Sequence, residues 1–207
     1  MKLISYLIDF VSLTSQKYGI DESHGVGHGM DVLVNANAIF SSEVLEHPSL
    51  RSQERIIYTS ASIHDMCDRK YMNPEEGIRA IETFLSDKIS QTEIEITKQI
   101  ISTMSYSKVK KNGFPQLNEY QLAYHIVREA DLLSAYDVDR CIIYNMHRLN
   151  GDLMTAYKDA KEIFEKRIFK HFEDGLFITE YSKKKGRELE IESYKRFNSW
   201  EKIIARL

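Results

Sequence analysis

The sequence predicts an all-α protein, and three observations support that prediction. Only three prolines and nine glycines interrupt the 207 residues, which leaves room for long helices. Apolar residues recur at helical spacing through most of the chain. Strand patterns are nearly absent, although the run LFIT at 176–179 is a weak candidate. We therefore expect one compact multi-helix bundle that spans residues 1–207 as a single domain.

The composition is that of an ordinary soluble globular protein. Hydrophobic residues make up 43% of the chain and charged residues 29%. The net charge of −3 gives no basis for a broad attraction to nucleic acid or to a membrane surface. Cys67 and Cys141 do not make a disulfide framework, and no apolar run approaches the length of a transmembrane helix. We expect a reduced, cytoplasmic protein with neither nucleic acid nor membrane as a partner.

Three helices are predicted in the first third of the chain. The first, within 1–19, is an amphipathic helix and not a signal sequence, because an acid lies inside its apolar run and no small-residue cleavage site follows. Glycine at three alternate positions predicts an irregular loop over 21–31, where the backbone approaches something closely. A helix should follow from about residue 28 or 29 to 46. After a break at Pro48, a largely buried helix is expected at 53–66.

Caps and polar segments delimit the later helices. Asn73 and Pro74, followed by two acids, form a strong helix start, since asparagine caps well and proline fits the first turn. The polar segment 105–118 predicts a long irregular loop, and the basic run SKKKGR at 182–187 is most simply a solvated turn. The remaining helices are expected at about 74–88, 91–104, 119–136, 138–149, 152–172 and 187–205.

The buried helix at 53–66 carries the first candidate site. Ile57, Ala61 and His64 lie at i, i+4 and i+7, which turns the imidazole toward the core. The carboxylate of Asp65 beside it is costly to bury unless a cation or hydrogen-bond donors compensate it. Imidazole and carboxylate are also the usual ligands of Mn²⁺, Fe²⁺, Co²⁺, Ni²⁺ or Zn²⁺. An isolated pair of this kind is otherwise a core histidine followed by a capping aspartate.

Two further residues extend this pair to a possible metal site. His28 lies at a predicted helix start, and Asp131 lies on an inward face of the predicted helix 119–136. Each has a simpler alternative, a loop histidine and a salt-bridged helix acid. Together with His64 and Asp65 they give the order H…HD…D, supplied by three separate helices. We interpret the set as four ligands of one divalent cation.

Four segments follow a known family pattern. ESHGVGHGMDVLVNA (22–36) is similar to DxxHDxxHxxRVxxxA, and ASIHDMCDRKY (61–71) is similar to AAxLHDIxDxKY. READLLSAYD (128–137) is similar to QDADRLDAxG, and ISTMSYSK (101–108) is similar to a segment between the second and third motifs. Over roughly residues 20–140 the sequence resembles the HD-domain phosphohydrolase superfamily, in particular its small stand-alone hydrolases.

The resemblance implies a fold, a metal and an activity. The fold would be an HD-domain bundle, with its motif-bearing core at about 20–140 and the C-terminal helices 138–207 packed on it. The metal would be one divalent ion (Mn, Fe, Co, Ni, Mg or Zn), and the partner a small phosphorylated substrate such as a nucleoside triphosphate or monophosphate. Carried over by position, the metal ligands are His28, His64, Asp65 and Asp131.

The sequence departs from the family pattern at four positions. These departures concern the surroundings of the metal and the substrate pocket more than the ligands themselves, so they leave the substrate open. They also keep an alternative open, a catalytically weak regulatory module that binds metal or nucleotide. The positions are Gly25, Asp31, Leu132 and Ser134.

Three neighbours of the ligands are candidate catalytic residues. His24 could contact a phosphate or the surroundings of the attacking water, or it could be a solvent-exposed loop histidine. Asp68 could serve as a general base and Lys70 as a phosphate contact. The alternative for these two is an exposed ion pair at a helix end. The oligomeric state stays open.

Histidine and cysteine bear on two further questions, the number of metal ions and the nature of the nucleophile. Dinuclear relatives supply extra histidines, but here only His125 lies between the HD pair and Asp131. Its six-residue spacing from Asp131 puts it about 120° around the helix, which favours one metal over two. A thiolate nucleophile at Cys67 is disfavoured, because nearby carboxylates raise a thiol pKa.

Overall fold

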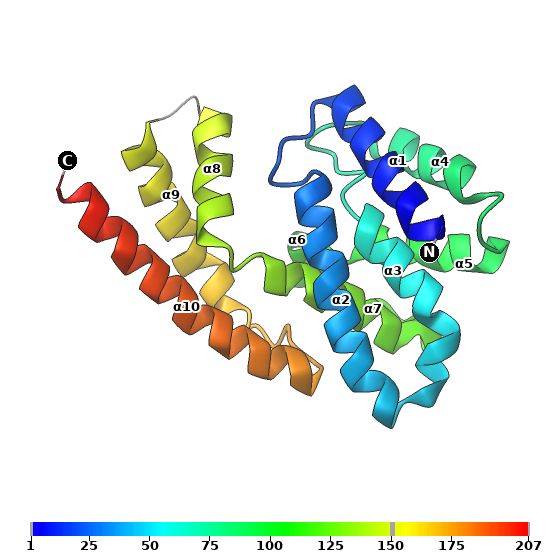
Figure 1. The fold of residues 1–207 in the computed structure, drawn as a ribbon. Helices are drawn as coiled ribbons and strands as arrows, with labels where there is room; N and C mark the ends of the chain where they lie inside the picture. The colour runs from blue at the N-terminus through cyan, green and yellow to red at the C-terminus, as the bar shows by residue number, and fades with distance from the viewer. Residues whose placement is uncertain (1, 150–151, 207) are drawn as a thin grey trace. The chain divides into compact units, whose positions relative to one another are not determined.

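The computed structural model describes residues 2–149 and 152–206, and it confirms the all-α prediction (Figure 1). Within these ranges the chain forms α-helices joined by turns and short 3₁₀-helices. No strand is present among the described residues, so the LFIT run at 176–179 is not one.

The chain divides into two compact units, Met1–Asp131 and Leu132–Leu207. The single-domain organisation and the packing of the C-terminal helices on the core stay predictions. The helix α7 begins in the first unit and ends in the second. Up to α7, the elements are α1 (Lys2–Tyr18), α2 (Val26–Glu46), η1 (Pro48–Gln53), α3 (Glu54–Ile63), α4 (Pro74–Leu85), α5 (Gln91–Thr103), α6 (Tyr106–Asn112), η2 (Asn118–Tyr120) and α7 (Gln121–Ser134). The elements of the second unit are α8 (Val138–Leu149), α9 (Leu153–Lys166), η3 (Ile168–Lys170) and α10 (Glu180–Ile204).

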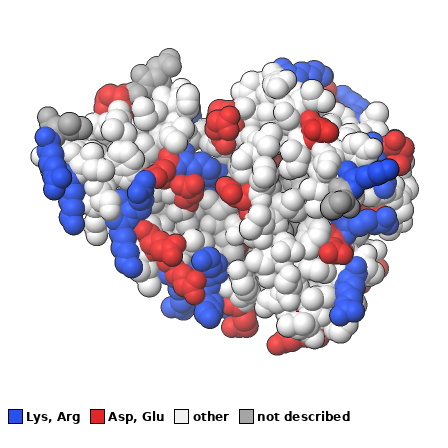
Figure 2. Space-filling model, in the orientation of Figure 1, with Lys and Arg blue, Asp and Glu red and all other residues white. Residues whose placement is uncertain are grey.

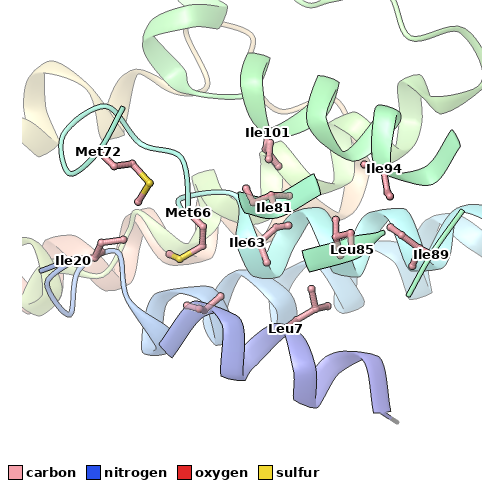
Figure 3. Close-up of a cluster of buried hydrophobic side chains, with 11 residues drawn as sticks. Leu7, Ile20, Ile63, Met66, Met72, Ile81, Leu85, Ile89, Ile94 and Ile101 are labelled. Carbon is pink, nitrogen blue, oxygen red and sulfur yellow. The ribbon is translucent and has the colours of Figure 1, made fainter. Parts of the chain in front are cut away.

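Helix α3 is the central element of the first unit. It packs against α1, α2 and α5, and seven of its ten residues are buried. A helix that is buried almost all round belongs in the interior of its unit. At its C-terminal end, Ile63 and Met66 lie in a cluster with apolar side chains of α1, α4 and α5 (Figure 3). The chain is therefore held firmly on both sides of His64 and Asp65.

The start of α2 differs from the sequence prediction. The helix begins at Val26, so the irregular segment ends at Gly25 and two of the predicted loop glycines lie in the first helical turn. The predicted close approach of the backbone is present at one of them. A Cβ atom on Gly29 would lie 3.0 Å from the carbonyl oxygen of Ser62 in α3. This contact brings the start of α2, with His28, against the end of α3.

The close approach at Gly29 can be tested by two matched substitutions. Gly29→Ala should lower the free energy of unfolding by about 1–3 kcal/mol, because the methyl group would press α2 away from α3. At Gly27 no atom would lie within 4 Å of an added Cβ. Gly27→Ala should therefore be neutral, or stabilising by up to about 1 kcal/mol, because alanine favours a helix. Urea unfolding measures both, and equal stabilities of the two variants would contradict the tight contact.

Two stretches predicted as irregular are helical. Part of the predicted loop 105–118 forms α6, which ends where Gly113 takes a φ of 75°. The basic run 182–187 lies inside α10, whose start is capped by the Thr179 hydroxyl accepting a hydrogen bond from the Ser182 amide at 3.2 Å. Gly186 fits there because a Cβ would lie 3.0 Å from the rings of Phe172 and Phe177. The glycine indicated a break, but it permits close ring packing instead.

The remaining predicted helices are present with shifted ends. The helix predicted at 53–66 ends at Ile63, and the one predicted at 152–172 ends at Lys166 and is followed by η3. Asn73 caps α4 by accepting a hydrogen bond from the Glu75 amide at 2.9 Å, as its position before Pro74 predicts.

The surface charges and the hydropathy of the helices agree with what the composition predicts, a mixed-charge surface and no transmembrane helix. On the face that Figure 2 shows, lysine and arginine side chains are interspersed with aspartate and glutamate. Among the described residues, no helix combines the length and the apolar character that crossing a membrane requires.

Candidate metal centre

The structure brings the four predicted metal ligands together. His28 lies in the first turn of α2, His64 and Asp65 directly follow α3, and Asp131 lies in α7. His28 Nε2 lies 3.2 Å from His64 Nε2 and 3.4 Å from both Asp65 Oδ2 and Asp131 Oδ1. His64 Nε2 lies 3.3 Å from Asp65 Oδ2 and 3.6 Å from Asp131 Oδ1. Adjacent ligands about 2.0–2.3 Å from one cation are about 3–4 Å apart, so these spacings suit one coordination sphere.

The ring of His64 is oriented by a backbone carbonyl. Its Nδ1 lies 2.9 Å from the oxygen of Ala61, one turn earlier in the chain. A carbonyl can only accept, so Nδ1 carries the proton and donates it. Nε2 then faces the two carboxylates and can offer its lone pair to a cation bound between them. Metal-binding histidines are commonly held in this way by a second hydrogen bond on the far nitrogen.

The buried carboxylate of Asp65 is faced by two imidazole nitrogens, at 3.3 Å and 3.4 Å from its Oδ2. Its Oδ2 is buried, and no hydrogen-bond donor for it is found among the described residues. The two histidine side chains that face it are only 3% and 5% exposed. A buried carboxylate oxygen normally has a donor or a cation beside it. Two imidazoles and two carboxylates are suitable donors for a divalent transition ion, so the residues present fit such an ion.

The electrostatics of the cluster also favour a cation. Burial alone would lower the pKa of His64, but the charges of Asp65 and Asp131 raise it well above its usual value. Burial alone would raise the pKa of Asp65, but the charges of His64 and His28 lower that pKa. The pKa of Asp131 is held well below its usual value by His28 and His64, against the opposing effect of burial. The two carboxylates stay ionised and create a field that stabilises positive charge between them.

Two of the predicted catalytic residues meet beside this cluster. Lys70 Nζ lies 3.0 Å from His24 Nε2, and the rings of His24 and His28 lie edge to face with centroids 6.1 Å apart. His24 is half-buried and is not the fully exposed loop histidine of the alternative interpretation. Burial lowers its pKa, and this effect outweighs the charges of Asp65 and Asp21, which raise the pKa, while the charges of Lys70 and His28 lower it further.

Asp68 is less directly connected to the cluster. Its carboxylate accepts a hydrogen bond from the Lys70 amide at 2.9 Å and lies 3.6 Å from Lys70 Nζ. Within the described part of the chain its side chain makes no hydrogen bond or ion pair with the four candidate ligands, and its backbone amide donates to the Asp65 carbonyl at 3.1 Å. Its side chain is 23% exposed, and that of Lys70 is 48% exposed. The ion pair of the alternative interpretation is thus present, and a role for Asp68 as a base stays a prediction.

Three residues that surround His24 were not among the residues predicted from the sequence. Ser23 Oγ lies 2.6 Å from His24 Nδ1, and Tyr71 Oη lies 3.1 Å from the same nitrogen. Both hydroxyls also contact the carboxylate of Asp21, Tyr71 at 2.6 Å. The available signals were the spacing of Asp21 three residues before His24 and the position of Tyr71 next to Lys70.

The comparisons with known proteins bear on the fold alone. No protein-family model and no curated protein matches the sequence. A solved structure does match. It is a crystal structure of a Lactobacillus plantarum protein from a structural genomics project, with a TM-score of 0.68 and 16% sequence identity. The match covers 99% of this chain and 97% of that chain. At this identity it shows a shared helical fold, and membership of the HD superfamily stays a prediction.

The surroundings of Cys67 and His125 argue against a role for either residue in catalysis or metal binding. Burial, together with the charge of Asp65, raises the pKa of Cys67 to about 11, so its thiol is protonated near neutral pH. His125 packs against the ring of Phe114 with centroids 4.9 Å apart. Burial and the charge of Arg128 lower the pKa of His125 to about 4.

Removing a divalent ion should destabilise the protein. An ion that binds the folded state at 100–1,000 times its dissociation constant contributes about 3–4 kcal/mol. For a chain of this length, that corresponds to a fall in Tm of about 5–15 °C on chelation. Thermal melts with and without chelator, with metal content checked in parallel, measure the effect, and added Mn²⁺ should reverse it. A melting curve that is unchanged after verified loss of metal would contradict a shared buried site.

Proposed function

We propose that the protein is a divalent-metal-dependent phosphohydrolase that acts on a nucleotide or a similar small phosphate ester. The observation that supports this best is that two imidazole nitrogens lie 3.2 Å apart and that each lies 3.3–3.6 Å from both an Asp65 oxygen and an Asp131 oxygen. Four protein ligands on a cation that accepts six leave positions for a water molecule and a phosphate oxygen. A cytoplasmic location would give the protein access to nucleotides.

The side chains divide the work as follows. His28, His64, Asp65 and Asp131 would hold the ion, which when bound lowers the pKa of a water molecule and polarises the phosphate. Lys70 would contact a phosphate oxygen as a point charge, since its side chain is half-exposed beside the cluster. Asp68 would orient the attacking water or accept its proton. His24 would hold Lys70 in place through the contact at 3.0 Å.

Two features favour a small anionic substrate. The cationic side chain that contacts His24 is Lys70, which can pair with one phosphate oxygen but cannot track a polymer backbone. The interspersed charges on the face in Figure 2 and the net charge of −3 offer no extended basic surface for nucleic acid. A nucleotide is the preferred substrate because the small stand-alone HD hydrolases, which the sequence resembles, act on such compounds.

The proposal is tested by incubating the full-length protein with Mn²⁺ and a panel of nucleoside mono-, di- and triphosphates. Release of phosphate or pyrophosphate is measured, with a chelator-treated sample as the matched control. We expect metal-dependent hydrolysis of at least one member of the panel. No hydrolysis by the metal-loaded protein would contradict the proposal. Nucleotide binding without turnover, measured by calorimetry, would instead support the regulatory module.

A further inference from the structure

A second group of polar side chains joins the loop before α2 to the turn after α3. Asp21 Oδ1 accepts hydrogen bonds from the Ser23 amide at 2.8 Å and from the Ser23 hydroxyl. Asp21 Oδ2 accepts a hydrogen bond from the Tyr71 hydroxyl at 2.6 Å. Both hydroxyls also lie at hydrogen-bonding distance from His24 Nδ1. The carboxylate is an acceptor only, so it fixes the direction of both O–H bonds.

The directions of the remaining hydrogen bonds follow from the chemistry of each group. An ammonium group has three donors and no acceptor, so at 3.0 Å from Lys70 Nζ the His24 Nε2 atom must be the acceptor. A neutral imidazole that accepts at Nε2 carries its proton at Nδ1. Ser23 and Tyr71 already donate to Asp21, so their oxygens can accept this proton. The hydrogen bonds among all five groups are then consistent with one tautomer of His24, Nδ1–H.

We propose that Asp21, acting through Ser23 and Tyr71, fixes His24 as the Nδ1–H tautomer and thereby positions the Lys70 ammonium to bind a phosphate oxygen. With the opposite tautomer, Nε2–H would point at the ammonium and push it away. Asp21, Ser23, Tyr71 and His24 are thus positioning residues, and Lys70 is the residue that touches the phosphate. This inference rests on the proposed function, because that function supplies the phosphate.

The arrangement also links Lys70 to two of the three segments that carry candidate metal ligands. His24 precedes His28 by four residues, and their rings are in edge-to-face contact. Lys70 and Tyr71 follow Asp65 in the turn where the Asp68 carboxylate accepts the Lys70 amide proton. The ammonium lies between His24 at 3.0 Å and Asp68 at 3.6 Å. The carboxylate of Asp21 can therefore determine where the Lys70 ammonium lies beside the candidate metal centre.

The key variant is Asp21→Asn, with Glu22→Gln as its control. The amide group that replaces the Asp21 carboxylate can donate to one hydroxyl, whose proton then turns toward His24 Nδ1 and favours the Nε2–H tautomer. Glu22→Gln makes the same chemical change one residue away, at an exposed side chain. Tyr71→Phe is a second test that removes one hydroxyl and keeps the carboxylate, for the case in which Asp21→Asn does not fold.

Two measurements on the full-length, Mg²⁺-saturated chain decide the inference. The first is ¹⁵N NMR of the His24 ring, which distinguishes the two tautomers without reference to activity. We expect Nδ1–H in the wild type and in Glu22→Gln, and a shift toward Nε2–H in Asp21→Asn. The shift in Tyr71→Phe should be smaller, because Ser23 Oγ can still accept the Nδ1 proton. The second is an equilibrium titration with inorganic phosphate. Lys70→Ala should weaken phosphate binding about tenfold, and Asp21→Asn about three- to tenfold.

The double variant Asp21→Asn/Lys70→Ala separates positioning from a general structural effect. If Asp21 acts through Lys70, the double variant should bind phosphate no more weakly than Lys70→Ala alone. If the losses in phosphate affinity of the two single variants multiply in the double variant, the inference is overturned. An Nε2–H tautomer in the wild type, or no binding of phosphate by the wild type, would also overturn it. So would an unchanged tautomer in both Asp21→Asn and Tyr71→Phe. If no nucleotide is hydrolysed, the proposed function fails, but the tautomer and the phosphate titration still decide this inference.

Discussion

Asp65→Asn should abolish tight binding of a divalent cation, with a loss in metal affinity of at least about 100-fold. Asp65 Oδ2 lies 3.4 Å from His28 Nε2 and 3.3 Å from His64 Nε2, so it faces both imidazole ligands at once. The substitution keeps the shape of the side chain but removes one negative charge from the cluster. Metal content after dialysis and calorimetric titration with Mn²⁺ measure the loss. Metal-dependent hydrolysis should disappear with it.

The matched control for this prediction is Asp9→Asn. Asp9 is exposed on α1 and loses the same charge, so its metal content should equal that of the wild type. The control separates the effect of the cluster from the change in net charge of the whole chain. An Asp65→Asn protein that still binds one equivalent of metal tightly would show that the four side chains do not act as a joint ligand set.

The candidate metal ligands could be predicted because each combines a residue type with a helix position. His64 lies one turn after Ala61 on the buried side of α3, and the helical period points it inward. Asp131 follows the same logic in α7. Pattern and side-chain chemistry therefore agreed, and the structure brings these residues together with His28.

Helix boundaries were harder to predict, because tertiary contacts outweigh local propensity. Glycine disfavours a helix, yet α2 starts at Val26, and Gly29 near its start lets the backbone approach Ser62 of α3. Helix α6 has only seven residues, too few for a periodic pattern to stand out. At Gly186 the helix continues and two phenylalanine rings pack against the glycine, and no neighbouring residue in the sequence predicts this packing.

The hydrogen bonds around His24 could not be predicted from the pattern. Asp21 and Tyr71 are 50 residues apart, and both lie in irregular segments that have no period. Contacts of this kind depend on how two loops meet once the helices on either side have packed. A polar residue beside a motif is therefore a weak signal on its own, even where the fold makes it a contact of a site residue.

A catalytic role of Asp68 can be distinguished from a purely structural role by comparing two substitutions. Its carboxylate accepts the Lys70 amide proton at 2.9 Å, which stabilises the turn that carries Lys70. Asp68→Asn keeps an oxygen for this hydrogen bond but cannot accept a proton from water. Asp68→Ala removes both. If Asp68 is the base, both variants should lower kcat by about 10²–10⁴-fold while metal content stays at one equivalent.

A purely structural role predicts a different result. Asp68→Asn would then turn over nearly like the wild type, and Asp68→Ala would act mainly by loosening Lys70. That loosening would raise KM in the same way as Lys70→Ala, because a lysine contributes a point charge to phosphate binding more than to the chemical step. Steady-state kinetics of the three variants, with metal analysis of each, distinguish the two roles. A kcat for Asp68→Asn within a few-fold of the wild type would contradict the base and leave Asp68 as a residue that supports Lys70.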